Sequence, residues 1–565
     1  MFNTNKSIFM NRRKFVEKLG LGTAAAAVVP SLAFSSCTQK SKAVNTGSTP
    51  VYGDDQALYI GDDIAVADTE SGKIKGYILN GIYTFLGVPY GADTSGKNRF
   101  MAPQKPEPWT NIRPAVFYGH TAPQNMDNKW PNAYSTFQDH WNYFDVSENC
   151  LALNIWTPSI NDGKKRPVIV WLHGGGFSAG NGIEHDGYHG ENISRKGDVV
   201  YVSINHRLGA IGFSDLSGVG GEKYKDSGNV GMLDVVASLE WINKNIANFG
   251  GDPGNVTVTG QSGGGAKVCC VAAMPAAKNL VHKGLALSGS MTEAQPQEQS
   301  QKLGAYILKE AGLKVSEVDK LQDIPWKEYL QIANAAQRKF NAENPPAQGG
   351  RSGYAPVADG IHIPQAPFFT GTTGAPNIPM VFCTTFNESN PDRDNAELEN
   401  VTLDEVKEKL QGRFGEKTAE IVDAYAQNFP EARPIELWAL IVSNRKGIIT
   451  AANAKLAEGS PVYVAWFGWQ PPLYNNRLRA FHCLDISFWF YNTDRMVTHT
   501  GGGLRPRKLS DKMSDSLLAF AKTGNPNVPT LPAWPQYTEA GGETLILDDI
   551  CEVKNNPDAV GRAAL

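Results

Sequence analysis

The chain has 565 residues, about four times the length of a typical single domain, although large sheet-based domains can reach this size. Hydrophobic residues make up 41% of it and charged residues 19%, so it has enough apolar side chains for a large core and is not a disordered chain. The formal net charge of −4 leaves no basic excess for contacts with phosphates, which argues against a nucleic-acid-binding protein. Composition therefore predicts a folded protein whose ligand is small or neutral.

Residues 1–37 have the pattern of an export signal. Basic residues at 11–15 precede an uncharged run at 19–34, which contains a proline and is too short to span a bilayer comfortably. The pair Arg12-Arg13, with Phe15 two places later, favours a twin-arginine (Tat) signal, and an ordinary secretory signal peptide is the alternative. We therefore expect the protein to be exported from a bacterial cytoplasm to the periplasm.

Two features of this segment leave alternatives open. Cys37 follows two serines and resembles a lipoprotein cleavage site, so the mature protein is either free in the periplasm or lipid-anchored at Cys37. Met10 is an alternative start to Met1. Residues 38–58 are polar and rich in Ser, Lys and Thr, which predicts a tether, and residues 59–565 are expected to form one domain.

Short β-rich segments alternate with helix-length segments through the centre of the chain. This order predicts an α/β fold with a mostly parallel sheet and helices on both faces. The predicted strands are 167–172, 198–204, 255–259, 284–287, 379–384 and 462–467, and helical spacing of apolar residues predicts a helix at 231–249. The first two strands are uniformly apolar, which indicates burial on both faces of the sheet.

The motif Gly-x-Ser-x-Gly occurs twice, around Ser178 and around Ser262. A nucleophile elbow needs a strand before the serine, small residues in a strained turn, and a helix after it. Residues 255–259 and 266–274 supply the strand and the helix around Ser262, whereas Ser178 follows a glycine loop. The context therefore favours Ser262 as a nucleophile.

The loop before Ser178 has a predicted role of its own. His173 and the three glycines 174–176 directly follow the strand at 167–172. Successive glycines leave backbone N–H groups free to face the oxyanion of a reacting ester, although a plain glycine turn has the same composition. Its place upstream of an elbow favours the catalytic interpretation.

These motifs and several further segments carry a family resemblance. The chain resembles the type-B carboxylesterases, the α/β-hydrolase family that includes cholinesterases, bile-salt lipases and bacterial para-nitrobenzyl esterases. The resemblance covers nearly the whole mature chain, in segments that occur in the family's order: 84–90 (TFLGVPY), 147–151 (SENCL), 205–213 (NHRLGAIGF), 231–234 (GMLD), 287–290 (LSGS), 356–360 (PVADG) and 520–527 (FAKTGNPN). It implies the α/β-hydrolase fold, with long loop insertions around the active-site cleft.

The resemblance also implies a catalytic triad. Glu388 resembles the family's acid and His482 its base, in the order Ser, Glu, His, and Asp392 is the alternative acid. With Ser262 as nucleophile, the amides of Gly175, Gly176 and Gly263 would form the oxyanion hole, a further catalytic set. The expected reaction is hydrolysis of a carboxylic ester through an acyl-enzyme, with no cofactor.

Substrate contacts are expected from Phe177 and from an aromatic segment at 117–144. This segment contains Trp130 and Trp141 and would border the cleft, the alternative being that its rings only cover the core. Small or aromatic esters are favoured over long-chain lipids, although a lipase is the nearest rival. We expect a monomer with a small-molecule substrate.

Three further features of the sequence bear on function. A catalytically inactive recognition protein of the same superfamily is disfavoured, because the whole triad is present. A metal site at His185 and His189 is disfavoured, because Gly187 between them weakens a helix and a third ligand is not evident. By resemblance, Arg99 with Glu148 and Arg207 with Asp234 form ion pairs that are structural and not catalytic.

Overall fold

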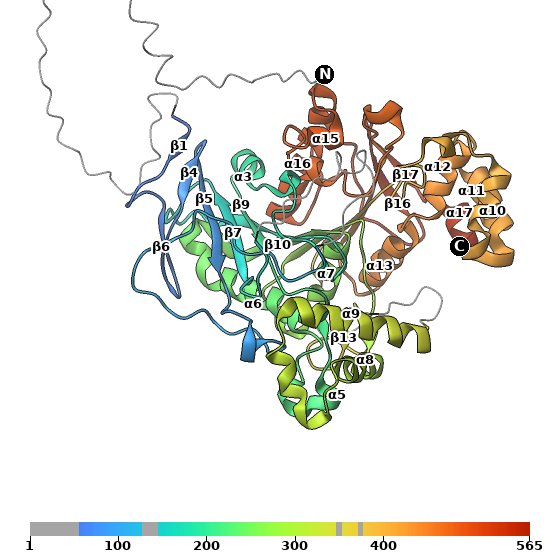
Figure 1. Cartoon of the computed structure of the whole chain (residues 1–565). Coiled ribbons are helices and arrows are strands. Elements are labelled where there is room, and N and C mark those ends of the chain that lie inside the picture. The colour runs from blue at the N-terminus through green and yellow to red at the C-terminus, as the bar shows by residue number, and fades with distance from the viewer. Residues whose placement is uncertain (1–55, 127–144, 346–352, 371–376) are drawn as a thin grey trace, which may run out of the picture. The chain divides into compact units, whose positions relative to one another are not determined.

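The computed structural model describes residues 56–126, 145–345, 353–370 and 377–565 (Figure 1). A sheet of twelve strands runs through these residues. In spatial order the strands are β1 (Leu58–Tyr59), β4 (Tyr77–Leu79), β5 (Ile82–Pro89), β7 (Ala152–Thr157), β9 (Val200–Ile204), β8 (Arg166–Leu172), β10 (Gly251–Gln261), β11 (Lys283–Leu287), β14 (Met380–Thr385), β15 (Val462–Phe467), β16 (Glu543–Leu547) and β17 (Glu552–Asn555).

The centre of the sheet is parallel and its flanks are antiparallel. All neighbouring pairs from β9 to β16 are parallel, whereas the pairs from β1 to β9 and the pair β16–β17 are antiparallel. Parallel neighbours require crossover connections, which helices supply between the central strands. The carboxyl ends of β8, β10, β14 and β15 therefore meet at one edge, where α/β sheets bind their ligands.

Residues of β8 alternate between the two faces, and both faces are buried. Val168, Val170 and Leu172 belong to one apolar core, and Ile169 and Trp171 belong to the other. The first core includes side chains of α6 (Val230–Asn245), α7 (Gly263–Ala273) and α13 (Arg445–Ala457), and the second includes side chains of α3 (Glu191–Gly197), α14 (Ile486–Trp489) and α16 (Leu504–Thr523). The predicted burial on both faces is confirmed.

The remaining helices form smaller groups beside this layered centre. Helices α8 (Gln297–Glu310) and α9 (Trp326–Glu343) pack on each other and on α5 (Ser217–Gly220) or α4 (Gly209–Phe213). Figure 1 shows a second group made of α10 (Leu403–Phe414), α11 (Thr418–Asn428), α12 (Pro434–Ile441) and α17 (Ala559–Ala564). In a small three-stranded sheet, β3 (Gly72–Lys75) lies between β2 (Val66–Thr69) and β6 (Arg113–Pro114), and in a two-stranded sheet β12 (Gln295–Pro296) pairs with β13 (Val357–Ala358).

The predicted elements agree with the observed ones except at their ends. The helix predicted at 231–249 is α helical only to Asn245 and continues as a 3₁₀ turn at Ile246–Phe249. None of the helices in the described ranges is long and apolar enough to cross a membrane.

The two predicted ion pairs are structural. Arg99 Nε lies 2.6 Å from Glu148 Oε1 with both side chains buried. Arg207 Nη2 lies 2.6 Å from Asp234 Oδ1, and both of these side chains are completely buried. Paired guanidinium and carboxylate groups satisfy each other's charges inside the fold, which confirms the structural interpretation.

Candidate active site

Ser262 occupies a strained turn between β10 and α7. Its backbone has φ 58° and ψ −123°, a region that non-glycine residues rarely adopt. Its amide donates to the carbonyl of Leu287 at 2.8 Å, which ties the turn to the neighbouring strand β11. Gly264 allows the turn to approach β8, because a Cβ atom at Gly264 would lie 2.0 Å from the carbonyl oxygen of Leu172. The geometry is that of a nucleophile elbow, with the N-terminus of α7 at the serine.

The glycine loop after β8 lies against this elbow. Gly175 and Gly176 have φ values of 78° and 62°, and a Cβ atom at Gly263 would lie 2.1 Å from the carbonyl oxygen of Gly176. Within the described part of the chain, the amides of Gly175, Gly176 and Gly263 donate no hydrogen bond. Three unpaired N–H groups beside a serine can stabilise an oxyanion.

Glu388 and His482 meet although they are 94 residues apart. They follow the carboxyl ends of β14 and β15, and Glu388 Oε2 accepts a hydrogen bond from His482 Nδ1. Glu388 Oε1 also accepts from the backbone amide of Thr385 at 2.7 Å. Burial disfavours the charged imidazole, but interactions with Cys483 and Glu388 outweigh it and raise the pKa of His482 well above its ordinary value.

The alternative acid, Asp392, has a different partner. Its carboxylate accepts two hydrogen bonds from Arg479 Nη1, at 2.8 Å and 3.0 Å, and both side chains are completely buried. A carboxylate held in this way is committed to an ion pair. The structure therefore brings Glu388, and not Asp392, to His482.

The structure does not join His482 directly to Ser262. His482 Nε2 lies 3.1 Å from the side-chain nitrogen of Gln261, the residue before the nucleophile. The Ser262 hydroxyl forms no hydrogen bond with any described residue. Catalytic hydrogen bonds are often incomplete without substrate, so this arrangement is compatible with a serine and base that meet during reaction.

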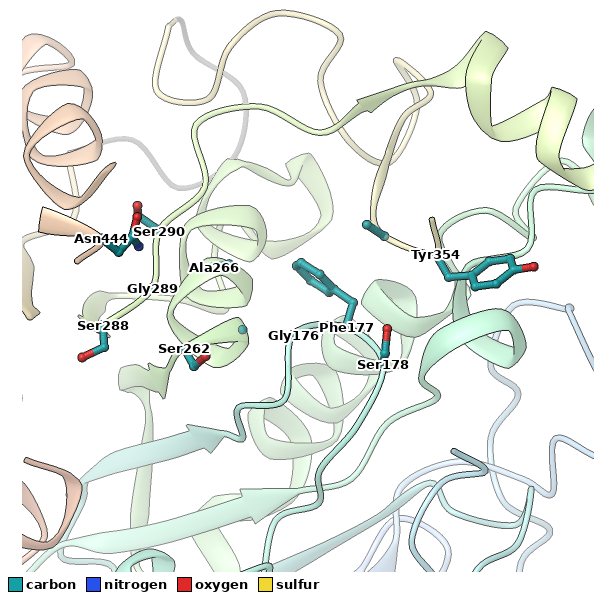
Figure 2. A pocket seen from close by; sticks show the side chains of 12 residues that line it. Gly176, Phe177, Ser178, Ser262, Ala266, Ser288, Gly289, Ser290, Tyr354 and Asn444 are labelled. Atoms are coloured by element: carbon teal, nitrogen blue, oxygen red, sulfur yellow. The ribbon is translucent and has the colours of Figure 1, made fainter. Parts of the chain in front are cut away.

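A cavity of about 380 Å³ opens on Ser262. Phe177 and Tyr354 line it with aromatic rings, and Figure 2 shows Ser290 and Asn444 close together at another part of its wall. The exposed side chain of Ser178 also lines the cavity, but Ser178 lies in the loop after β8 and not between a strand and a helix.

The predicted aromatic rim is described only in part. Trp130 and Trp141 lie outside the described residues. At the start of the segment, Phe117 is 75% exposed and Tyr118 packs against the second apolar core. The described rings thus include one that faces solvent and one that covers the core.

Two residues in the site were missed by the sequence analysis. Asp485, three residues after His482, is completely buried, and burial together with Glu388 raises its pKa to about 7. Lys267, five residues after Ser262, is completely buried in α7 and donates to the carbonyl of His173 at 3.0 Å. Their spacing from Ser262 and His482 was the available signal, since a charged residue inside an apolar segment is rarely buried without a role.

The described residues contain no group of three or more His, Cys, Asp or Glu side chains that could hold a metal ion. His185 and His189 instead contact aromatic rings: the His185 ring centre lies 4.0 Å from that of Tyr188, and His189 lies 5.1 Å from Trp156.

Comparison with known proteins identifies the family of the chain. The model of the carboxylesterase family matches residues 63–560. The chain belongs to the carboxylesterase family. It is 34% identical to the para-nitrobenzyl esterase of Bacillus subtilis over 88% of this chain and 98% of that protein, and 32% identical to the phenmedipham hydrolase of Pseudarthrobacter oxydans over 86% and 95%.

Solved structures agree with the family. An esterase from Clostridium hathewayi, described as able to hydrolyse aliphatic aromatic polyesters, superposes with a TM-score of 0.76 at 34% identity, covering 90% of this chain and 99% of the other. A carboxylesterase of Geobacillus stearothermophilus gives a TM-score of 0.73 at 31% identity, covering 88% and 99%. The fold is that of the α/β-hydrolases, and the protein is a carboxylic-ester hydrolase of the serine type.

Proposed function

We propose that this carboxylesterase uses Ser262 as nucleophile, His482 as base and Glu388 as the acid that orients the base. The observation that supports this assignment is that the carboxyl ends of four parallel strands, β8, β10, β14 and β15, lie at one edge of the sheet, where the elbow, the glycine loop and the Glu388–His482 pair follow them. An unassisted serine hydroxyl attacks esters poorly because its pKa is too high, so a neighbouring base is needed.

In the proposed reaction, substrate binding displaces the Gln261 amide from His482 Nε2, which then accepts the proton of Ser262. The serine oxygen attacks the ester carbonyl, and the amides of Gly175, Gly176 and Gly263 stabilise the negative charge on the carbonyl oxygen. His482 returns the proton to the leaving alcohol, and Glu388 stabilises the imidazolium meanwhile. Water then attacks the acyl-enzyme by the same steps and releases the acid.

The substrates we propose are small or aromatic esters. A cavity of about 380 Å³ is near the lower end of ligand pockets, which span about 300–1,000 Å³, and long acyl chains would exceed it. The Phe177 side chain, which lines the cavity, adds an apolar ring that suits an aromatic group of the substrate. We include Trp130 and Trp141 as further substrate contacts on the sequence pattern alone.

The test compares Ser262→Ala with Ser178→Ala in the purified protein. A panel of p-nitrophenyl esters of increasing acyl length, with benzoate esters beside them, measures kcat/KM for each variant. We expect Ser262→Ala to lose at least about 10⁴-fold in kcat and Ser178→Ala to stay within about threefold. A fluorophosphonate should label Ser262, located by peptide mass spectrometry. Label on Ser178, or full activity of Ser262→Ala, would contradict the assignment.

For the rest of the chain we propose residues 1–37 as a Tat export signal, 38–58 as a tether and 59–565 as one monomeric catalytic domain. The periplasm, or a lipid anchor at Cys37, would then be the protein's location. Cell fractionation with Arg12→Lys/Arg13→Lys tests export, because a Tat signal should fail without its arginine pair and leave activity in the cytoplasm. Palmitate labelling lost in Cys37→Ala would identify the anchor, and light scattering measures the oligomeric state.

A further inference from the structure

Lys267 lies in α7, the helix that follows the nucleophile, and its side chain is completely buried. All the other buried residues of α7 are Gly, Ala, Val or Cys. Its Nζ atom donates to the carbonyl of His173 at 3.0 Å and lies 5.6 Å from the centre of the Phe177 ring. Within the described residues no carboxylate lies close enough to Nζ to form an ion pair. Burying an ammonium group without an ion-pair partner costs free energy. The contacts that Lys267 does make therefore indicate why a lysine is present at this position.

The hydrogen bond from Lys267 begins a series that holds the glycine loop. Lys267 holds the carbonyl of His173, and the His173 ring nitrogen Nδ1 lies 3.0 Å from the carbonyl of Gly174. The carbonyl of Gly175 accepts from the amides of Ser178 at 3.2 Å and Ala179 at 3.0 Å. Three successive carbonyls, just before and within the proposed oxyanion loop, therefore have fixed partners.

Peptide planarity converts these fixed carbonyls into fixed N–H directions. In a trans peptide the carbonyl of one residue and the amide of the next lie in one plane and point in opposite directions. Holding the carbonyl of Gly174 thus turns the amide of Gly175 to the other side, and holding the carbonyl of Gly175 does the same for Gly176. These two amides are the unpaired donors beside Ser262.

We propose that Lys267 is a positioning residue for the oxyanion hole: its hydrogen bond to the His173 carbonyl anchors the first peptide plane of the loop and, through His173, sets the direction of the Gly175 amide. Lys267 itself does not touch the substrate. This inference rests on the proposed function, because it assumes that the amides of Gly175 and Gly176 bind the oxyanion of an ester attacked by Ser262.

The charged and titratable groups that face Lys267 are Glu184, His173 and His206. Burial lowers the pKa of Lys267 to about 7, and Glu184 partly opposes this shift. Burial also raises the pKa of Glu184, which accepts from the Tyr188 hydroxyl at 2.6 Å, to about 7. The stacked rings of His173 and His206 lie 4.9 Å apart, and burial with the nearby ammonium keeps the pKa of both well below the ordinary value. A neutral His173 can donate from Nδ1 to the Gly174 carbonyl, as the series requires.

The test replaces Lys267 with methionine, which has a similar length but no charge and no donor. We expect kcat of Lys267→Met to fall at least about tenfold while KM stays within about threefold, because the lost interaction acts in the transition state. Affinity for a trifluoromethyl ketone, whose serine adduct places an oxyanion in the hole, should fall by the same factor. Lys267→Gln retains an N–H donor and should recover part of both losses.

Matched variants separate positioning from stability. Val268→Ala removes a buried side chain of the same helix that packs toward Gly284 of β11, so it should lower the melting temperature and leave kcat per fluorophosphonate-labelled site unchanged. If Lys267→Met behaves like Val268→Ala, or keeps its kcat and inhibitor affinity, the inference is wrong. If Lys267→Met yields too little folded protein, Lys267→Ala, which also lacks a donor, takes its place in the same two measurements, and full values there would overturn the inference.

Ser262→Ala, measured in parallel, distinguishes failure of the positioning role of Lys267 from failure of the proposed function. An inactive Ser262→Ala beside a fully active Lys267→Met overturns the positioning role alone. An active Ser262→Ala overturns the proposed function and the positioning role with it.

Discussion

The two halves of the catalytic site are built in different ways. The nucleophile half, residues 173–176 and 260–265, is positioned by close approaches of the backbone. The acid–base half, residues 385–392 and 479–485, is positioned by side chains from loops that are far apart in sequence. The first arrangement depends on residues that lack a side chain, and the second depends on residues whose side chains reach each other.

In the nucleophile half, glycine is required where backbones meet. A Cβ atom at Gly289 would lie 1.7 Å from the carbonyl oxygen of Ser262, and one at Gly264 would lie 2.0 Å from that of Leu172. Both contacts are with backbone atoms, which cannot move aside as a flexible side chain can. The position of Ser262 is thus set by strands β8, β10 and β11 together.

In the acid–base half, a few polar contacts join the two loops. The amide of Asn387 donates to the carbonyl of Ala480 at 3.1 Å, and the Asn387 side chain accepts from the Ala480 amide at 3.3 Å. Behind them lies the buried pair of Asp392 and Arg479. We expect this half to tolerate changes of shape but not the loss of a polar partner.

The largest effect is expected from Gly264→Ala. The new methyl group would overlap the carbonyl oxygens of Leu172 and His173, at 2.0 Å and 2.9 Å, so either the elbow or the glycine loop must shift. We expect esterase activity to be lost and the melting temperature to fall steeply. Gly412→Ala is the control: it adds a methyl group to α10 with nothing within 4 Å, and should be neutral or raise stability by about 0.5–1 kcal/mol. Equal behaviour of the two variants would show that the elbow is not close-packed.

Glu388→Gln should reduce kcat by about 10³–10⁴-fold while the fold stays intact, because an amide cannot stabilise the imidazolium. Glu388→Gln should also shift the pH dependence of activity, and the direction of the shift follows from the pKa of His482. His482 acts as a base only when neutral, so activity falls as pH drops through its pKa, and Glu388 helps to raise that pKa above about 6.5. Removal of the carboxylate should therefore move the acidic limb of the kcat/KM profile to lower pH. An unchanged limb would show that Glu388 does not act on His482.

The same contrast explains what could be predicted from the sequence. Strands β8 and β14 were predicted within two residues, because a continuous apolar run is a local signal of burial on both faces. The antiparallel flanks were not: β17 (EVKN) is largely exposed, and its pairing with β16 depends on contacts that leave little trace in its composition. The elbow and the glycine loop were predicted from glycine spacing, because glycine is required at the positions where two backbone segments come into close contact.

The missed residues depend on long-range contacts. Lys267 reaches a carbonyl 94 residues away, and a lysine at one position of a helix usually faces solvent. Gln261 was seen only as the variable residue of the serine motif, and its contact with His482 needs the folded arrangement of β10 and β15. Glu388 and His482 were proposed by resemblance to a family, and their meeting is a property of the fold that spacing alone does not encode.

Asp392→Asn should separate stability from catalysis in the acid–base half. Removing one partner of a buried ion pair leaves Arg479 insufficiently neutralised, which typically lowers the free energy of unfolding by about 3–5 kcal/mol. Glu399 lies 2.6 Å from Arg479 and should keep the loss near the lower end, about 3 kcal/mol. Urea unfolding measures the change, with the exposed Glu222→Gln as a control that should match the parent. Activity per labelled site should change less than about threefold; a loss as large as that of Glu388→Gln would make Asp392 a member of the triad.

The smallest effect is expected from Asp485→Asn, and it should appear only as a change in pH dependence. The Asp485 carboxyl is completely buried, and burial together with Glu388 raises its pKa to about 7, while His482 and the Trp489 side chain only partly oppose the shift. In the unfolded chain its pKa is about 3.9, so between these values the folded state holds the proton more firmly and the free energy of unfolding declines as pH rises from about 4 to 7.

Asparagine has nearly the same shape and no charge, so it should remove this decline. We expect Asp485→Asn to gain about 2–3 kcal/mol over the parent on going from pH 5 to pH 8, measured by urea unfolding at both values. Asp63→Asn, at an exposed carboxylate, should give no such gain. If the two Asn variants show the same difference from the parent at both pH values, the Asp485 carboxyl has the same proton affinity in the folded and unfolded chain. That result would mean that polar contacts in the acid–base half offset the cost of burying the charged Asp485 carboxylate.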